Sequence, residues 1–71
     1  MPFQFGRSRL PELLVENHMS QAEFARRLDV TEGYISKIIG LNSKFSLIKA
    51  KEAAHILKCH IDDLYEWKYV R

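Results

Sequence analysis

The sequence has few of the residues that would place it in a specialised class of protein. It contains one cysteine, Cys59, which excludes an internal disulfide bond. Three glycines and two prolines among 71 residues leave no low-complexity or linker segment. No stretch resembles a signal peptide or is apolar for long enough to span a membrane. We therefore expect one small cytoplasmic domain that covers residues 1–71, with no membrane partner.

An excess of charge of one sign is also missing. Eleven basic and nine acidic residues give a formal net charge of +2, which by itself does not indicate a nucleic-acid partner. The three histidines and Cys59 lack the spacing of metal ligands. The sequence shows neither a nucleophile–base set nor a glycine-rich phosphate loop. We expect neither catalysis nor a cofactor.

The most informative stretch is residues 20–40, which predicts two short helices joined by a tight turn. Ser20 and Glu23 have the spacing of a capping box at the start of the first helix. Phe24 and Leu28 lie one helical turn apart and form its apolar side. This pattern predicts a helix that begins at Ser20 and buries one side.

The second helix of this stretch follows a turn at Asp29. Aspartate tolerates the left-handed backbone conformation better than most residues, although less well than glycine. Thr31 is the expected N-cap, and Gly40 is the expected C′ residue that closes the helix. The apolar residue Ile35 is expected to face the core.

Helical patterns also flank this centre. Ser8 is the expected N-cap of a first helix whose apolar side includes Leu10, Leu13 and Leu14. Residues 60–64 predict a short fifth helix. A fourth helix is expected to be capped by Ser46 and to turn inward Leu47, Ala50, Ala53, Ala54 and Leu57.

Both ends of the chain alternate aromatic and polar residues, as strands do. A short strand is expected near the N-terminus, with a break at Gly6, and a second strand in the C-terminal tail, residues 65–71. The two strands pair either within the monomer or across a dimer. The candidates for this pairing are Phe3, Phe5, Tyr65, Trp67 and Tyr69.

The segments SQAEFARRLDVTEGYISKI and SLIKAKEAAHILKCHIDDLY resemble the phage-repressor and Cro helix-turn-helix family, also called the xenobiotic-response-element type. The resemblance implies an all-α, five-helix, lambda-repressor-like domain with its helix-turn-helix core at residues 20–40. A two-stranded antiparallel sheet from the termini is an optional addition. The chain departs from the family at Asp29, where a turn glycine is common. Leu14 and Ile39 replace an ionic pair, which predicts an apolar clamp between the first and third helices.

The resemblance also implies which residues contact DNA. The helix at 31–39 would lie in the major groove, where lysine can donate to guanine and glutamate can accept from cytosine. The expected base-contacting positions are Glu32, Gly33, Ser36 and Lys37. The expected phosphate-contacting residues are Gln21, Thr31, Tyr34, Asn42, Ser43 and Lys44. Packing on the preceding helix remains an alternative for Tyr34, and a helix-dipole role remains one for Glu32.

These expectations favour a sequence-specific regulator of transcription that binds double-stranded DNA. We expect a small repressor of phage or mobile-element type that binds DNA as a homodimer. The alternative is an antitoxin or anti-repressor, in which the same fold serves as a protein-interaction module and a partner docks on the aromatic tail.

Overall fold

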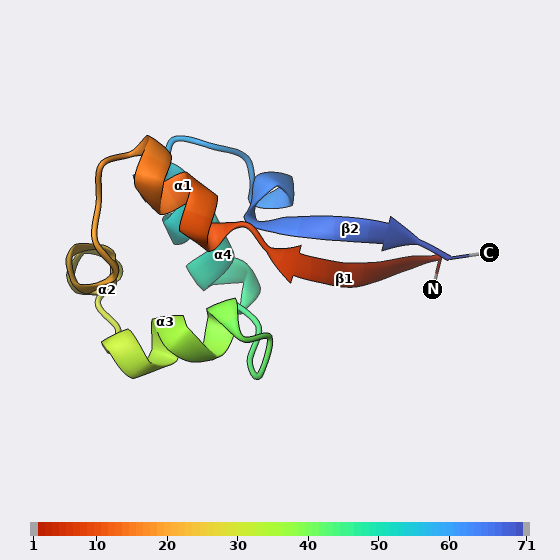
Figure 1. The fold of residues 1–71 in the computed structure, drawn as a ribbon, viewed down its shortest axis with the longest axis horizontal. Coiled ribbons are helices and arrows are strands. Elements are labelled where there is room, and N and C mark those ends of the chain that lie inside the picture. The colour runs from red at the N-terminus through yellow and green to blue at the C-terminus, as the bar shows by residue number, and fades with distance from the viewer. Residues whose placement is uncertain (1, 71) are drawn as a thin grey trace.

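The computed structural model describes residues 2–70 as a helical body from which a two-stranded ribbon projects (Figure 1). Both ends of the described chain lie at the tip of this ribbon. No helix in this part of the chain is long and apolar enough to cross a membrane. The elements, in chain order, are β1 (Phe3–Ser8), α1 (Leu10–Glu16), α2 (Gln21–Leu28), α3 (Glu32–Ile39), α4 (Leu47–Ile56), the 3₁₀ helix η1 (Ile61–Leu64) and β2 (Tyr65–Tyr69).

The expected all-α, five-helix architecture is therefore correct only in part. Four α-helices are present, and the fifth helical segment is a single 3₁₀ turn of four residues. Asp63 begins this turn by accepting a hydrogen bond from the backbone N–H of His60 at 3.0 Å. Four residues are too few for the successive i→i+4 hydrogen bonds of an α-helix, and 3₁₀ turns are usually this short.

The ribbon formed by β1 and β2, which we call the arm, pairs the two termini antiparallel within one chain. Phe3 lies opposite Tyr69, and Phe5 lies opposite Trp67. The strands thus pair within the monomer, which is one of the two arrangements that the sequence left open.

The expected break at Gly6 is wrong, because β1 continues through this residue to Ser8. The register advances by one extra residue in β1 between Phe5 and Ser8, which is a β-bulge. A Cβ atom at Gly6 would lie 2.8 Å from the backbone oxygen of Glu66. Glycine therefore permits a close approach of the two strands rather than ending the first one.

The longer strand also changes the start of α1. Ser8 belongs to the strand and is buried, and the N-cap of α1 is Arg9, which makes no side-chain cap. The Ser8 hydroxyl still accepts a hydrogen bond from the N–H of Leu10 at 3.3 Å. The local signal for a helix start was correct, but it lies one residue too early.

A single core lies among the four helices and the base of the arm. Its largest fully buried side chains include Leu10, Phe24, Ile35 and Ile38, contributed by α1, α2 and α3. Leu14 is buried in the same core, and Ile39 is half-buried against it. Both residues of the expected apolar clamp thus lie at the core, one on α1 and one on α3.

The expected inward direction of Leu47 is wrong. Leu47 is 77% exposed and Ile48 is 74% exposed, whereas Ala50, Ala53 and Ala54 are buried. α4 therefore packs against the core mainly through alanines, with Ile56 half-buried against the core at its C-terminal end.

All four α-helices end in the same way, with a left-handed residue that is not glycine. These residues are His18, Asp29, Leu41 and Lys58, with φ between 54° and 63°. After α3, for example, the N–H of Leu41 donates to Ile38 and the N–H of Asn42 donates to Lys37, which is the Schellman pattern. Asp29 thus adopts the expected turn conformation. Gly40 does not, because the left-handed residue is Leu41.

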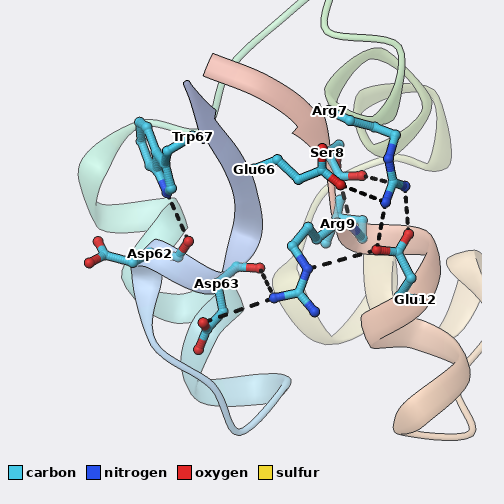
Figure 2. Close-up of polar contacts among 9 residues, drawn as sticks. Arg7, Ser8, Arg9, Glu12, Asp62, Asp63, Glu66 and Trp67 are labelled. Atoms are coloured by element: carbon cyan, nitrogen blue, oxygen red, sulfur yellow. Dashed lines mark hydrogen bonds and ion pairs between the residues drawn. The ribbon is translucent and has the colours of Figure 1, made fainter. Parts of the chain in front are cut away.

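A group of charged side chains fixes the arm to the body (Figure 2). The Arg7 guanidinium donates to Glu12 of α1 at 2.6 Å and to Glu66 of β2 at 2.9 Å. Arg9 lies 3.7 Å from Glu12 and 4.0 Å from the carboxylate of Asp63. Arg7, which lies on β1, therefore connects this strand to both α1 and β2. We call the group formed by Arg7, Arg9, Glu12, Asp63 and Glu66 the arm clamp.

Candidate nucleic-acid interface

A sharp turn joins helices α2 and α3, and a side-chain hydrogen bond caps the start of each helix. The Ser20 hydroxyl caps α2 by accepting from the N–H of Glu23 at 3.1 Å. The Glu23 carboxylate does not complete the predicted capping box; it binds Arg27 at 2.6 Å instead. The Thr31 hydroxyl caps α3 by accepting from the N–H of Tyr34 at 3.0 Å, as expected.

One side of α3 is exposed to solvent, and its polar side chains have no partner within residues 2–70. Ile35 and Ile38 turn into the core, whereas the four expected base-contacting positions are exposed. Within residues 2–70, the side chains of Glu32, Ser36 and Lys37 make no hydrogen bond or ion pair. They are thus free to bind a partner without first breaking an internal contact.

Gly33 lies on this surface in the first turn of α3. Apart from the adjacent residues and the backbone of α3, the atom of residues 2–70 that an added Cβ would approach within 4 Å is the Thr31 hydroxyl oxygen, at 3.8 Å. The space above Gly33 is therefore open to solvent, and a partner can approach the backbone there more closely than at any residue with a side chain.

The start of α2 has the chemistry of an anion-binding site. Gln21 is the first residue of the helix and is exposed. The first backbone N–H groups of a helix have no intrahelical partner, and the helix dipole makes this end attractive to phosphate. The Gln21 side chain can add its own amide donors. The phosphate contact expected for Gln21 stays a prediction.

The loop after α3 places the other expected phosphate-contacting residues. Asn42 and Lys44 are exposed, and Ser43 is half-buried. The Lys44 ammonium donates to the Leu41 carbonyl at 3.0 Å and lies 5.3 Å from the centre of the Phe5 ring. Lys44 is therefore held toward the arm, with two of its three N–H donors left for a phosphate.

The environment of Tyr34 favours packing over a phosphate contact. The expected packing partner was the preceding helix, whereas the ring lies beside Phe45. Its ring is half-buried and lies 6.1 Å from the ring of Phe45 in the loop. The N–H of Phe45 in turn donates to the Tyr65 hydroxyl at 3.4 Å. Burial raises the pKa of Tyr65, so this hydroxyl stays neutral at physiological pH. The three residues connect the first turn of α3 to the base of the arm.

Sequence reasoning missed part of this neighbourhood. Leu47 and Ile48 form an exposed apolar pair directly after the loop, at the start of α4. Lys49 donates to the Leu28 carbonyl at 3.0 Å and so holds α4 against the end of α2. Ser46 correctly predicted where α4 begins. It did not indicate which side of the first turn of α4 would face the core.

Features of other kinds of site are weak in the described chain. Residues 2–70 contain no group of three or more His, Cys, Asp and Glu side chains that could hold a metal ion. Burial raises the pKa of the Cys59 thiol, so it is a poor nucleophile. The exposed surface of α3, with the start of α2 and the loop at 42–44, remains the best candidate site.

The comparison with protein families agrees with this geometry. The helix-turn-helix family model matches residues 12–64, from within α1 to the end of η1. The chain belongs to the Cro/C1-type helix-turn-helix family, a family of DNA-binding regulators of transcription. A search of curated proteins finds no match. In this class of protein the second helix of the motif enters the major groove, and here that helix is α3.

Proposed function

We propose that the protein is a sequence-specific regulator of transcription, a small repressor of phage or mobile-element type, that binds double-stranded DNA through α3. The observation that carries this proposal is the exposed side of α3, where Glu32, Ser36 and Lys37 have no partner within residues 2–70. Repression follows from occupancy alone, because a protein bound over a promoter blocks access to it.

The proposed roles follow from the chemistry of each side chain. Lys37 donates to guanine O6 or N7, and Glu32 accepts from the amino group of cytosine. Ser36 bonds a base edge or a phosphate, and Gly33 brings the backbone close to the groove floor. The phosphate contacts of Gln21 and the 42–44 loop set the register and orientation on the duplex without reading its sequence.

A binding-site selection from random duplexes, followed by fluorescence anisotropy on the selected DNA, tests this proposal. Lys37→Ala should weaken binding to the selected DNA about 5- to 150-fold, the equivalent of 1–3 kcal/mol for one base contact. It should also relax the preference at one base pair. Ser36→Ala should weaken binding to a smaller extent.

Lys51→Ala is the matched control, because it removes the same charge from an exposed position in the middle of α4. It should lower affinity for selected and random DNA by the same small factor. If Lys37→Ala behaves like Lys51→Ala, α3 does not read the groove. A steep loss of affinity with salt, without sequence preference, would instead identify a nonspecific DNA binder.

The exposed aromatic side chains of the arm favour a second candidate, an antitoxin or anti-repressor that binds another protein. Trp67 is 43% exposed, and its indole N–H donates to the Asp62 carbonyl at 2.8 Å. In this case Trp67→Ala should abolish binding of the partner protein, and no duplex should be enriched in the selection.

A further inference from the structure

A small hollow lies between the arm and η1. It is lined by Phe3 of β1, Trp67 of β2 and Asp62 of η1, and its volume is about 330 Å³. This volume is at the lower end of the range of small-molecule sites, about 300–1,000 Å³. The hollow therefore has room for one small group, bordered by two aromatic rings and one carboxylate.

Contacts outside the hollow hold the Trp67 ring in place. The indole N–H donates to the carbonyl oxygen of Asp62 at 2.8 Å, and Figure 2 shows the ring standing over this residue. The ring centres of Phe5 and Tyr65 lie 5.1 Å and 6.0 Å from that of Trp67. Trp67 nevertheless stays 43% exposed, and Phe3 is 54% exposed. A ligand would thus meet an indole ring whose orientation is already fixed, which reduces the entropy lost on binding.

The charge of the hollow is negative. Asp62 is exposed, and its carboxylate makes no hydrogen bond or ion pair within residues 2–70. Figure 2 shows this carboxylate pointing away from Arg9, to which the neighbouring Asp63 is paired at 4.0 Å. The faces of aromatic rings are also electronegative, so they attract cations. The carboxylate and the rings therefore favour the same kind of ligand, a cation.

The arm already binds one cation of its own chain in this way. The Lys44 ammonium lies 5.3 Å from the centre of the Phe5 ring. This distance is within the reach of a cation–π interaction, about 6 Å. Lys44 does not line the hollow, and no lysine or arginine of residues 2–70 does. The hollow is therefore a second position for a cation on the same aromatic surface, one that the described chain does not fill from within.

The small number of hydrogen-bond acceptors decides which kind of cation fits. A primary ammonium has three N–H donors, and a guanidinium has five. The lining offers them the Asp62 carboxylate, because the Asp62 carbonyl already accepts from Trp67. The remaining donors would lose water beside the rings without gaining a partner, which is unfavourable. A quaternary ammonium has no N–H donor to leave unpaired, and its methyl groups can contact the ring faces directly.

We propose that Phe3, Trp67 and Asp62 form a binding site for a small quaternary ammonium compound. The methylated nitrogen lies against the two rings, and the Asp62 carboxylate is its counter-ion. Because the site is open to solvent and contacts one head group, its affinity is low, with a Kd of about 1–10 mM. The site lies on the arm and η1, on different elements from the exposed side of α3, so it does not depend on DNA binding.

Titrations of the full chain with three related alcohols test the class of ligand. Choline carries a quaternary ammonium, ethanolamine carries a primary ammonium, and neohexyl alcohol is choline with carbon in place of the charged nitrogen. Trp67 is the only tryptophan of the chain, so its fluorescence reports directly on the hollow. At an ionic strength kept constant with sodium chloride, choline should cause a saturable change in the millimolar range. Ethanolamine and neohexyl alcohol should bind at least about 5-fold more weakly.

Three results of these titrations would overturn the proposal. Equal binding of neohexyl alcohol would mean that the hollow is only an apolar surface. Equal binding of ethanolamine would mean that it accepts any ammonium. The third result is that choline causes no saturable change in either the fluorescence or the NMR signal of the Trp67 indole N–H.

A pair of charge variants tests the role of the carboxylate. Asp62→Asn removes the charge and keeps the backbone carbonyl that binds Trp67, and it should weaken choline binding about 2- to 5-fold. The matched control is Glu16→Gln, which removes the charge of another exposed carboxylate, at the end of α1 and outside the hollow. Glu16→Gln should bind choline as the wild type does. Equal effects of the two variants would overturn the role of Asp62, because binding would then follow the net charge.

A pair of ring variants tests the aromatic contact even if each variant weakens the arm. Phe3→Leu and Tyr69→Leu remove one ring each from the same cross-strand pair, whose ring centres are 5.3 Å apart. Of the two, Phe3 lines the hollow. Phe3→Leu should therefore weaken choline binding about 2- to 5-fold, whereas Tyr69→Leu should leave it unchanged. Equal effects would overturn the site, because binding would then depend on the stability of the arm rather than on the ring of Phe3.

Discussion

Replacing Gly33 by alanine should separate the stability of the protein from its function. Gly33 has an exposed position in the first turn of α3, and the nearest atom to an added Cβ is 3.8 Å away. Glycine within a helix costs about 0.5–1 kcal/mol relative to alanine. Gly33→Ala should therefore raise the free energy of unfolding by this amount, and the melting temperature by about 2–8 °C for a domain of this size.

The same methyl group should weaken DNA binding if the backbone at Gly33 lies against the groove. Inserting a methyl group into a packed contact costs about 1–3 kcal/mol. Thermal unfolding by circular dichroism and anisotropy with the selected duplex measure the two effects on one sample. Ala22→Gly is the mirror control, because Ala22 has the same position in α2; it should lose about the stability that Gly33→Ala gains. A Gly33→Ala protein that is more stable and binds DNA unchanged would refute the close approach.

Two further predictions concern the scaffold. Leu41 has a φ of 63°, so Leu41→Gly should raise the free energy of unfolding by about 0.5–1 kcal/mol in chemical denaturation, whereas Leu41→Ala, which keeps the Cβ atom, should not. The hydrogen bonds from Arg7 lower the pKa of Glu12, so this pair stabilises the fold above the ordinary carboxyl pKa and the contribution is lost as the pH falls through the lowered value. Melting curves should therefore show Glu12→Gln less stable than the wild type at neutral pH, with the difference vanishing in acid; a difference independent of pH would contradict the role of the Arg7 pair.

The helices of the central motif were predictable because their signals are local. Ser20 and Thr31 cap their helices as their residue types suggest, and Asp29 takes the left-handed turn. The buried positions of α2 and α3 follow the apolar period of the sequence. Each of these features depends on residues within one or two helical turns.

The errors arose where distant segments decide the outcome. Gly6 was interpreted as a break, but its role depends on Glu66, which is sixty residues away in the sequence. Leu47 was placed inside because it fits the helical pattern, yet the start of α4 meets the core through Ala50, and Leu47 is 77% exposed. Gly40 was the expected left-handed residue, but α3 ends at Ile39 as predicted, Gly40 is its C-cap, and Leu41 adopts the left-handed conformation.

The sequence predicted which residues of the candidate site are exposed, but not which residues of other segments lie beside them. The exposure of Glu32, Ser36 and Lys37 agrees with the sequence reasoning, and their DNA contacts stay predictions. The contact between Lys44 and Phe5 could not be foreseen, because it requires the N-terminal strand to lie beside the loop after α3. The same contact connects the DNA-facing loop to the arm.

The central claim is that the exposed side of α3 lies in the DNA groove. Its most direct test is a titration of the ¹⁵N-labelled full chain with the selected duplex, followed by amide chemical shifts. We predict that the largest changes fall at Gln21, at residues 32–37 and in the loop at 42–44. Changes confined to the outer side of α4, around Lys51 and Lys58, with residues 32–37 unaffected, would contradict the account.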